Sequence, residues 1–145
     1  MEPQHPLTFF PNSTTDFIWQ SERSGFNHLF HYNIDKGLIA QITKGNWLVT
    51  ELLGFNEKKK EIFYTSTQET PLERNLYKVN WNTFKTEKLT NQAGMHTGIL
   101  SKDGNHLYDS YSNSNSPRIV NVINTNTLKS KNLITSENTL KNYQR

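Results

Sequence analysis

The sequence of 145 residues contains no cysteine, and this absence excludes several kinds of site. Without thiols the chain cannot form a disulfide, a thiolate zinc site or a cysteine nucleophile. Hydrophobic residues are also scarce, at 33%, and no apolar run approaches the ~20 residues that a bilayer-spanning helix needs. Residues 1–6 lack the charged and then apolar layout of a signal peptide. The sequence therefore offers no membrane span, no signal peptide and no covalent cross-link.

A strong charge of one sign is also lacking, since the formal net charge is only +3. The densest basic run, Lys58–Lys60, is flanked by Glu57 and Glu61. A nucleic-acid interface needs a basic stripe on one face of the fold. We therefore interpret this run as a solvated turn and expect no nucleic-acid partner.

What the sequence does contain is a repeat of about 45 residues. Three short segments each have an aromatic residue at the third position and serine at the fifth, and they start at residues 17, 62 and 106. A second and a third set of segments follow them in the same order and at nearly the same spacing. The second set is 28–32, 75–79 and 118–122, and the third set is 41–43, 88–90 and 133–135.

Each unit also opens with a short apolar segment, at 7–10, 48–55 and 97–100. Four strands in each unit of about 45 residues are typical of a β-propeller blade. Period-two alternation in 75–81 favours strands over helices. The sequence predicts an all-β fold of about three four-stranded antiparallel blades, at approximately 1–46, 47–94 and 95–135.

Three blades are too few to close a ring, because each blade of a propeller packs both faces against neighbours. We expect an open arc whose end blades leave apolar faces uncovered, and hence a part of a larger propeller. Made alone, such an arc would associate as a homo-oligomer or be poorly stable.

Several sequence segments resemble the β-propeller of the dipeptidyl peptidase IV family. The clearest are 17–29 (FIWQSERSGFNHL), 41–50 (QITKGNWLVT) and 71–77 (PLERNLY), followed by Gly94-Met95-His96 and Tyr111-Ser112-Asn113. They occur in the family's order and at its spacing, from about residue 2 to residue 135. The likeness is to Bacteroidetes-like bacterial members of these prolyl oligopeptidase-type serine peptidases.

The resemblance implies the C-terminal part of an eight-bladed N-terminal propeller over residues 1–135. Residues 136–145 resemble the polar linker toward an α/β-hydrolase domain that is missing from this sequence. The parent enzyme would remove X-Pro or X-Ala dipeptides from peptide N-termini, and this segment would help wall the substrate chamber and gate access. Its partners would be the rest of the propeller, the hydrolase domain and, through the parent, peptides. The resemblance also implies a periplasmic, cell-envelope or secreted location.

No catalytic residue is carried over to this chain. It lacks a G-x-S-x-G nucleophile elbow, and Ser110, for example, lies between Asp109 and Tyr111. It also lacks the adjacent pair of glutamates that grips the substrate amine in the family. We therefore predict a non-enzymatic segment with no catalytic, substrate-binding, cofactor-binding or metal-binding residue, and no cofactor. The alternative is a stand-alone propeller-type repeat scaffold for protein–protein interaction.

The most conspicuous single residues have structural interpretations. His96 starts the innermost strand of the third unit, where we expect a structural role. His28 and His31 are three residues apart in a strand, so they point to opposite faces and do not share a metal ion. We expect each tryptophan to pack against the next blade and Asp103–Gly104 to form a hairpin turn. A short helix is predicted over 138–144.

Overall fold

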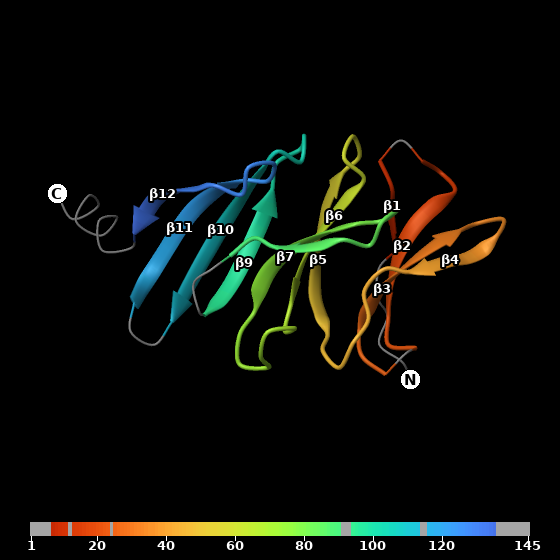
Figure 1. The fold of residues 1–145 in the computed structure, drawn as a ribbon, viewed down its shortest axis with the longest axis horizontal. Helices are drawn as coiled ribbons and strands as arrows, with labels where there is room; N and C mark the ends of the chain where they lie inside the picture. Colours follow the sequence, from red (N-terminus) through yellow and green to blue (C-terminus); the bar gives the residue numbers. More distant parts are fainter. Residues whose placement is uncertain (1–6, 12, 24, 91–93, 114–115, 136–145) are drawn as a thin grey trace.

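The computed structural model describes residues 7–11, 13–23, 25–90, 94–113 and 116–135. These residues form twelve strands and no helix, arranged as three four-stranded antiparallel sheets that lie in one row (Figure 1). The described ranges accordingly contain no helix able to span a membrane. The predicted all-β fold with three four-stranded blades is confirmed, and the row is open rather than closed.

Each blade is a meander in which strand order along the sheet follows strand order along the chain. Blade 1 contains β1 (Leu7–Phe9), β2 (Asp16–Ser21), β3 (His28–Asn33) and β4 (Gly37–Gln41). Blade 2 contains β5 (Val49–Asn56), β6 (Glu61–Ser66), β7 (Asn75–Asn80) and β8 (Thr86–Lys88). Blade 3 contains β9 (Met95–Leu100), β10 (His106–Asn113), β11 (Ser116–Asn124) and β12 (Ser130–Thr135).

The predicted fourth-strand segments 41–43 and 88–90 lie at the ends of β4 and β8 rather than within them, so this prediction of strand position was wrong in blades 1 and 2. Thr43 Oγ1 accepts a hydrogen bond from the Leu29 N–H at 3.0 Å, and Thr90 makes the equivalent bond in blade 2 at 3.3 Å. A side-chain hydroxyl thus replaces the next ladder bond, and the chain leaves the sheet there.

An asparagine starts the hairpin between the third and fourth strands of every blade. The side chains of Asn33, Asn80 and Asn124 each accept the N–H groups two and three residues ahead, at 2.8–3.0 Å. This is the side-chain geometry that favours a tight turn. Each hairpin then places one residue at a left-handed φ: Gly37 (82°), Phe84 (62°) and Leu128 (64°).

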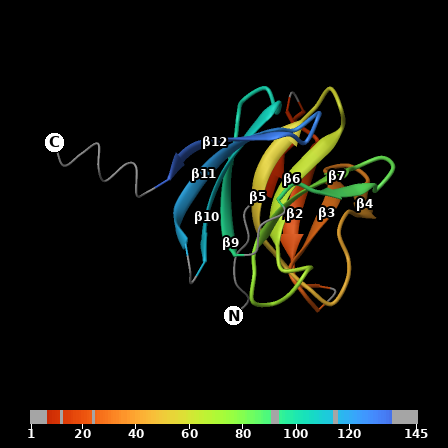
Figure 2. The same cartoon turned by 60° about the vertical axis from the view of Figure 1, so that its left-hand side comes forward.

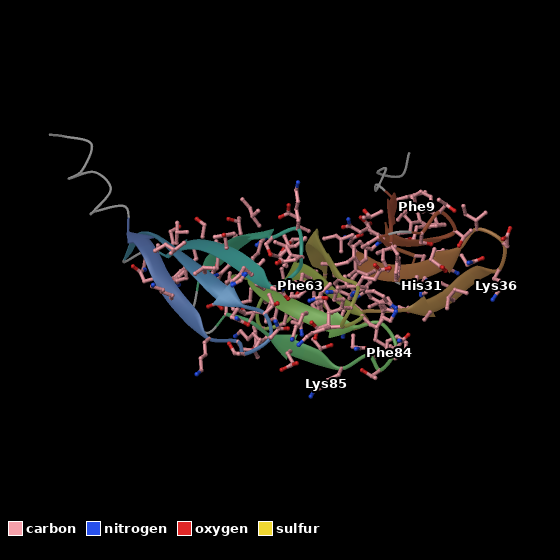
Figure 3. The ribbon with its side chains drawn as sticks, turned by 90° about the horizontal axis from the view of Figure 1, so that it is seen from above. Phe9, His31, Lys36, Phe63, Phe84 and Lys85 are labelled. Carbon is pink, nitrogen blue, oxygen red and sulfur yellow. The ribbon has the colours of Figure 1, made fainter. Side chains whose placement is uncertain are left out.

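Blade 2 is buried on both faces because it lies between the other two. Neighbouring sheets face one another in the turned view of Figure 2. One apolar cluster joins blades 1 and 2, with Ile18 and Leu29 against Tyr77 and Val79. A second cluster joins blades 2 and 3 and includes Phe63, which Figure 3 places in the middle of the molecule. The alternation predicted for 75–81 is therefore confirmed, and both of its faces are core.

Backbone hydrogen bonds repeat at each seam, the contact between neighbouring blades. The Val49 N–H donates to the Asn27 carbonyl at 2.8 Å, and the His96 N–H donates to the Arg74 carbonyl at 2.9 Å. The first strand of a blade is thereby tied to the blade before it. The division into a propeller part at 1–135 and a linker at 136–145 stays a prediction, and both the linker and the predicted helix lie outside the described residues.

Candidate functional site

The outer face of blade 1 carries an uncovered layer of aromatic side chains. Phe17 stacks on Tyr32 with ring centroids 5.6 Å apart, and the Arg23 guanidinium lies 5.7 Å from the Phe30 centroid and donates to the Tyr32 hydroxyl. Large exposed hydrophobic residues surround them: Leu7, Phe9, Trp19 and Leu38. Figure 3 shows Phe9 at this end of the row. This face is as rich in apolar and aromatic side chains as a surface that is normally buried in a protein core.

The outer face of blade 3 is also apolar. Ile99 and Tyr108 lie opposite each other in β9 and β10, and Ile99 is 72% exposed. Leu107, which points to the other side of β10, is fully buried at the seam with blade 2. A sheet with hydrophobic residues on both faces is typical of one that is covered on both. Both ends of the row therefore present surfaces suited to a further blade.

Each tryptophan was expected to pack against the next blade, and the three differ in whether they do so. Trp81 of blade 2 packs on Phe10 of blade 1 at 4.6 Å, as predicted. Trp47, in the connection between blades 1 and 2, contacts the ring of His28 edge-on at 4.7 Å. Trp19 lies on the outer face of blade 1, where no described blade covers it.

A buried cation links blades 2 and 3. Lys78 Nζ lies 2.9 Å from Glu61 Oε2 and 3.8 Å from Glu87 Oε1, and it donates to the Thr125 carbonyl of blade 3 at 2.8 Å. Its side chain is 7% exposed. Sequence reasoning missed this residue, although a lysine within an otherwise apolar strand was a signal. A buried charge persists only where it is paired and hydrogen-bonded.

His96 is fully buried and has the structural role that was expected. Its Nδ1 lies 2.7 Å from Asp109 Oδ1, and its ring stacks on Tyr111 at 4.5 Å. The other carboxylate oxygen, Asp109 Oδ2, is buried without a hydrogen-bond partner among the described residues. This pair is enclosed at the seam and does not open to a cleft in the described part of the chain.

His28 and His31 point to opposite faces of β3, as predicted. His31 contacts Asp16 at 3.2 Å, and hydrogen bonds from Asn33 and then His31 hold the pKa of the Asp16 carboxyl below its ordinary value. His28 instead contacts Thr43, which lies in the connection to blade 2. Each histidine therefore serves a separate local network.

The Asp103–Gly104 turn between β9 and β10 forms as predicted. Asp103 Oδ1 accepts hydrogen bonds from the Ser101 hydroxyl at 2.6 Å and from the Asn105 N–H at 2.9 Å. These two hydrogen bonds hold the pKa of the exposed Asp103 carboxyl below its ordinary value. The turn also contacts blade 2, because the Asn56 side chain reaches the Gly104 carbonyl at 3.4 Å.

A cleft of about 400 Å³ opens at the seam between blades 1 and 2. We call it the seam cleft. The rings of Trp47, Tyr64 and Phe84 line it, with polar side chains that include Lys44 and Gln68. Phe84 lies at the tip of the β7–β8 hairpin, beside blade 1 (Figure 3). The volume falls within the range of small-ligand pockets, about 300–1,000 Å³.

His28 holds the wall of the seam cleft in position. The Gly45 carbonyl can only accept, so His28 Nε2–H donates to it at 3.0 Å, and Nδ1 of the neutral ring accepts a hydrogen bond from the Thr43 hydroxyl at 2.8 Å. Burial lowers the pKa of His28 and so favours the neutral ring over the cation. The histidine thereby fixes the loop that carries Trp47.

Gln68 is oriented by two hydroxyl groups at the floor of the seam cleft. Tyr64 and Ser66 donate to its Oε1 at 3.1 and 2.9 Å. Burial raises the pKa of the Tyr64 phenol well above its ordinary value, so the phenol remains a donor. Among the described residues, no acceptor takes the two Nε2 hydrogens of Gln68, which remain available to a ligand.

Three meandering blades packed face to face, with uncovered apolar faces at both ends, define a segment of a β-propeller. Residues 1–118 match the family model described as the dipeptidyl peptidase IV (DPP IV) N-terminal region. The chain therefore belongs to the dipeptidyl peptidase IV family, within the N-terminal region of its members.

Individual relatives agree with this assignment. Dipeptidyl peptidase 4 of Trichophyton equinum is 32% identical over 108 residues, which cover 73% of this chain and 14% of the relative. The crystal structure of Porphyromonas gingivalis dipeptidyl peptidase 4 has a TM-score of 0.81 at 28% identity and covers 89% of this chain. A putative dipeptidyl aminopeptidase IV from Bacteroides ovatus has a TM-score of 0.80 at 35% identity and covers 92% of it. The chain spans 18% and 22% of those two structures.

Proposed function

We propose that the chain forms the last part of the propeller wall of a serine dipeptidyl peptidase and carries no catalytic group itself. The observation that supports this most strongly is the difference in burial between the blades. Blade 2 is covered on both faces, whereas blades 1 and 3 each present an apolar outer face. Further blades of an eight-bladed ring would cover both surfaces, and the relatives are long enough to contain them.

The parent enzyme is proposed to remove X-Pro or X-Ala dipeptides from peptide N-termini in the periplasm or cell envelope. Support for the activity comes from relatives that are named dipeptidyl peptidase 4. Within that enzyme the segment would help enclose the substrate chamber and restrict entry to short peptides. A chain of rigid blades, tied together at each seam by backbone bonds, suits such a wall.

Peptidase assays separate the parent from this segment. The full reading frame and the isolated chain are purified and given Gly-Pro and Ala-Pro chromogenic substrates. We expect hydrolysis by the parent and none by the segment. Hydrolysis by the segment would contradict its non-catalytic role, and an inactive parent would contradict the proposed activity.

The gating role needs a different measurement. Lys78→Met in the parent should loosen the seam between blades 2 and 3, where Lys78 reaches Thr125. We expect cleavage of a long polypeptide to rise relative to cleavage of a chromogenic dipeptide substrate. Limited proteolysis reports whether the seam has loosened. A loosened seam with an unchanged ratio would show that this wall does not control access.

The second candidate is a stand-alone repeat scaffold for protein–protein interaction. The same two uncovered faces favour it, because another chain could cover them. The surrounding reading frame discriminates between the two candidates. A hydrolase domain directly after Arg145 supports the peptidase wall, and a stop codon there, with more blades upstream, supports the scaffold.

A further inference from the structure

Phe84 occupies a backbone conformation that costs energy for an aromatic residue. The equivalent hairpin positions in the other blades hold Gly37, for which a left-handed φ is free of strain, and Leu128. Leu128 compensates by packing against the apolar cluster of the second seam. Phe84 has no such compensation, since it is 47% exposed at the edge of the seam cleft. Strained residues of this kind gather where a ligand uses them.

The remaining rings of the seam cleft are held by their neighbours. Trp47 and Tyr64 are within 8° of parallel, with centroids 6.4 Å apart. His28 fixes the loop of Trp47, and Tyr77 stacks behind Tyr64 at 5.6 Å. Tyr64 is only 1% exposed and lies behind Trp47, so the cleft presents one preorganised ring, Trp47, and a second ring, Phe84, at its edge.

Two side chains of the seam cleft, Gln68 and Lys44, offer hydrogen-bond donors to a ligand. The Gln68 carboxamide uses its oxygen internally and keeps both Nε2 hydrogens. Lys44 makes no ion pair with a described residue, and no carboxylate lines the cleft. A matching ligand would therefore supply hydrogen-bond acceptors to these two side chains and flat apolar surface to the rings.

We propose that the seam cleft binds a proline-rich peptide segment in the polyproline II conformation. Such a segment has no backbone N–H at its prolines, exposes its carbonyl oxygens to donors, and presents pyrrolidine rings that pack on aromatic side chains. The donors Gln68 and Lys44 match the carbonyls, and the rings of Trp47 and Phe84 match the prolines. The extended conformation is preformed, so binding orders little of the peptide. The site is distinct from the proposed peptidase activity and does not depend on it.

Binding is measured with the capped hexaproline peptide Ac-Pro6-NH2, whose blocked ends exclude cleavage by an aminopeptidase and attraction of a free carboxylate. Calorimetry on the full-length parent gives the affinity, and its ¹H–¹⁵N tryptophan indole signals, assigned with Trp47→Phe and Trp19→Phe, locate the site. We expect the signal of Trp47 to shift and that of Trp19 to stay. A capped Gly-Ser hexapeptide should not bind.

Two variants test the contacts without disturbing the fold. Phe84→Gly removes the ring and introduces the residue that blade 1 has at the same place, and Gln68→Glu keeps both internal hydrogen bonds but removes the Nε2 donors. Each should weaken hexaproline binding by about tenfold, whereas the exposed control Lys85→Ala should leave it unchanged.

Three outcomes would overturn the proposal. One is no hexaproline binding at millimolar concentration, and another is binding that neither variant weakens. The third is preference for a small aromatic anion such as benzoate, lost in Lys44→Gln, which would make the cleft a carboxylate site instead. A parent without dipeptidyl peptidase activity would leave the peptide-binding result standing, because the probe is never cleaved.

Discussion

At the scale of single residues, the seams depend on a few polar side chains. Lys78 reaches from the middle of blade 2 to a carbonyl of blade 3, and Glu61 neutralises it at 2.9 Å. In blade 1, His28 ties β3 to the loop that carries Trp47. Such groups are costly to bury and costlier still to leave without their partner.

Removing the cation of the buried pair should therefore destabilise the chain strongly. In Lys78→Met the Glu61 carboxylate stays at a site where its side chain is 13% exposed. We expect the free energy of unfolding, from urea titration, to fall by about 3 kcal/mol. The double variant Lys78→Met/Glu61→Leu should recover most of this loss. An equal loss in the exposed control Lys85→Ala would contradict the argument.

Stability should also depend on pH through His28. Burial lowers its pKa in the folded protein below the ordinary value of 6.5. The unfolded chain then takes up a proton at a higher pH than the folded chain, so stability is full above pH 6.5 and falls as the pH drops below it, until the folded-state pKa is reached. Urea titrations between about pH 5 and 8 measure this slope.

His28→Asn is the matched control for that slope. Asn75 occupies the equivalent position in blade 2 and accepts a hydrogen bond from Thr90 at 3.0 Å, so asparagine suits this site. The variant should retain the fold and lose the part of the slope that His28 contributes. An identical pH profile in both proteins would show that another group titrates.

At the scale of elements, hairpins and strand ends determine how the blades approach each other. The β9–β10 turn packs Gly104 directly against Asn56 of blade 2, and the Thr125 hydroxyl donates to the Gly104 carbonyl at 2.6 Å. Gly37 has a similar φ, 82° against 76°, but has open space around it. A side chain at Gly37 would therefore meet backbone strain alone, whereas a side chain at Gly104 would meet the same strain and a steric clash with Asn56.

Alanine substitution at the two glycines should therefore have unequal costs. Gly37→Ala is expected to lower the free energy of unfolding by about 1 kcal/mol through strain alone. Gly104→Ala adds a Cβ only 2.8 Å from the Asn56 Cβ, and it should cost about 1–3 kcal/mol more. Equal thermal or urea midpoints for the two variants would contradict close packing at this seam.

Prediction of elements from the sequence succeeded for the first three strands of each blade and for the fourth strand of blade 3, and it failed for the fourth strands of blades 1 and 2. Alternation around Tyr77 and Val79 is a local pattern and could be read directly. The end of β4 is determined by the Thr43 hydroxyl bonding the Leu29 N–H, which depends on pairing across 14 residues. Similarly, the left-handed φ of Phe84 and Leu128 could not be predicted, because neither is glycine.

At the scale of the whole molecule, the two end faces dominate behaviour in solution. Phe9 and Ile99 lie on opposite outer faces, at 45% and 72% exposure. Apolar surfaces of this kind associate in water. Because the two faces differ, contact between copies would be head-to-tail.

The isolated chain should therefore sediment as species larger than the 16.9 kDa monomer. The double variant Phe9→Glu/Ile99→Lys places a charge on each outer face, and we expect it to shift the distribution toward monomer in analytical ultracentrifugation. Thr97→Lys, also on the outer face of β9 but replacing a polar residue, should have a smaller effect. A wild-type chain that is monodisperse and melts cooperatively as a monomer would contradict this prediction.

The sequence by itself determined the blade count, the strand order and the family, because these depend on repeats and short segments that lie close together along the chain. Only the tertiary structure decided which groups meet across the seams. The Lys78 contact with Thr125 spans 47 residues, and the seam cleft joins Lys44 to Phe84. Such contacts arise from how two sheets pack face to face, and no local pattern specifies them.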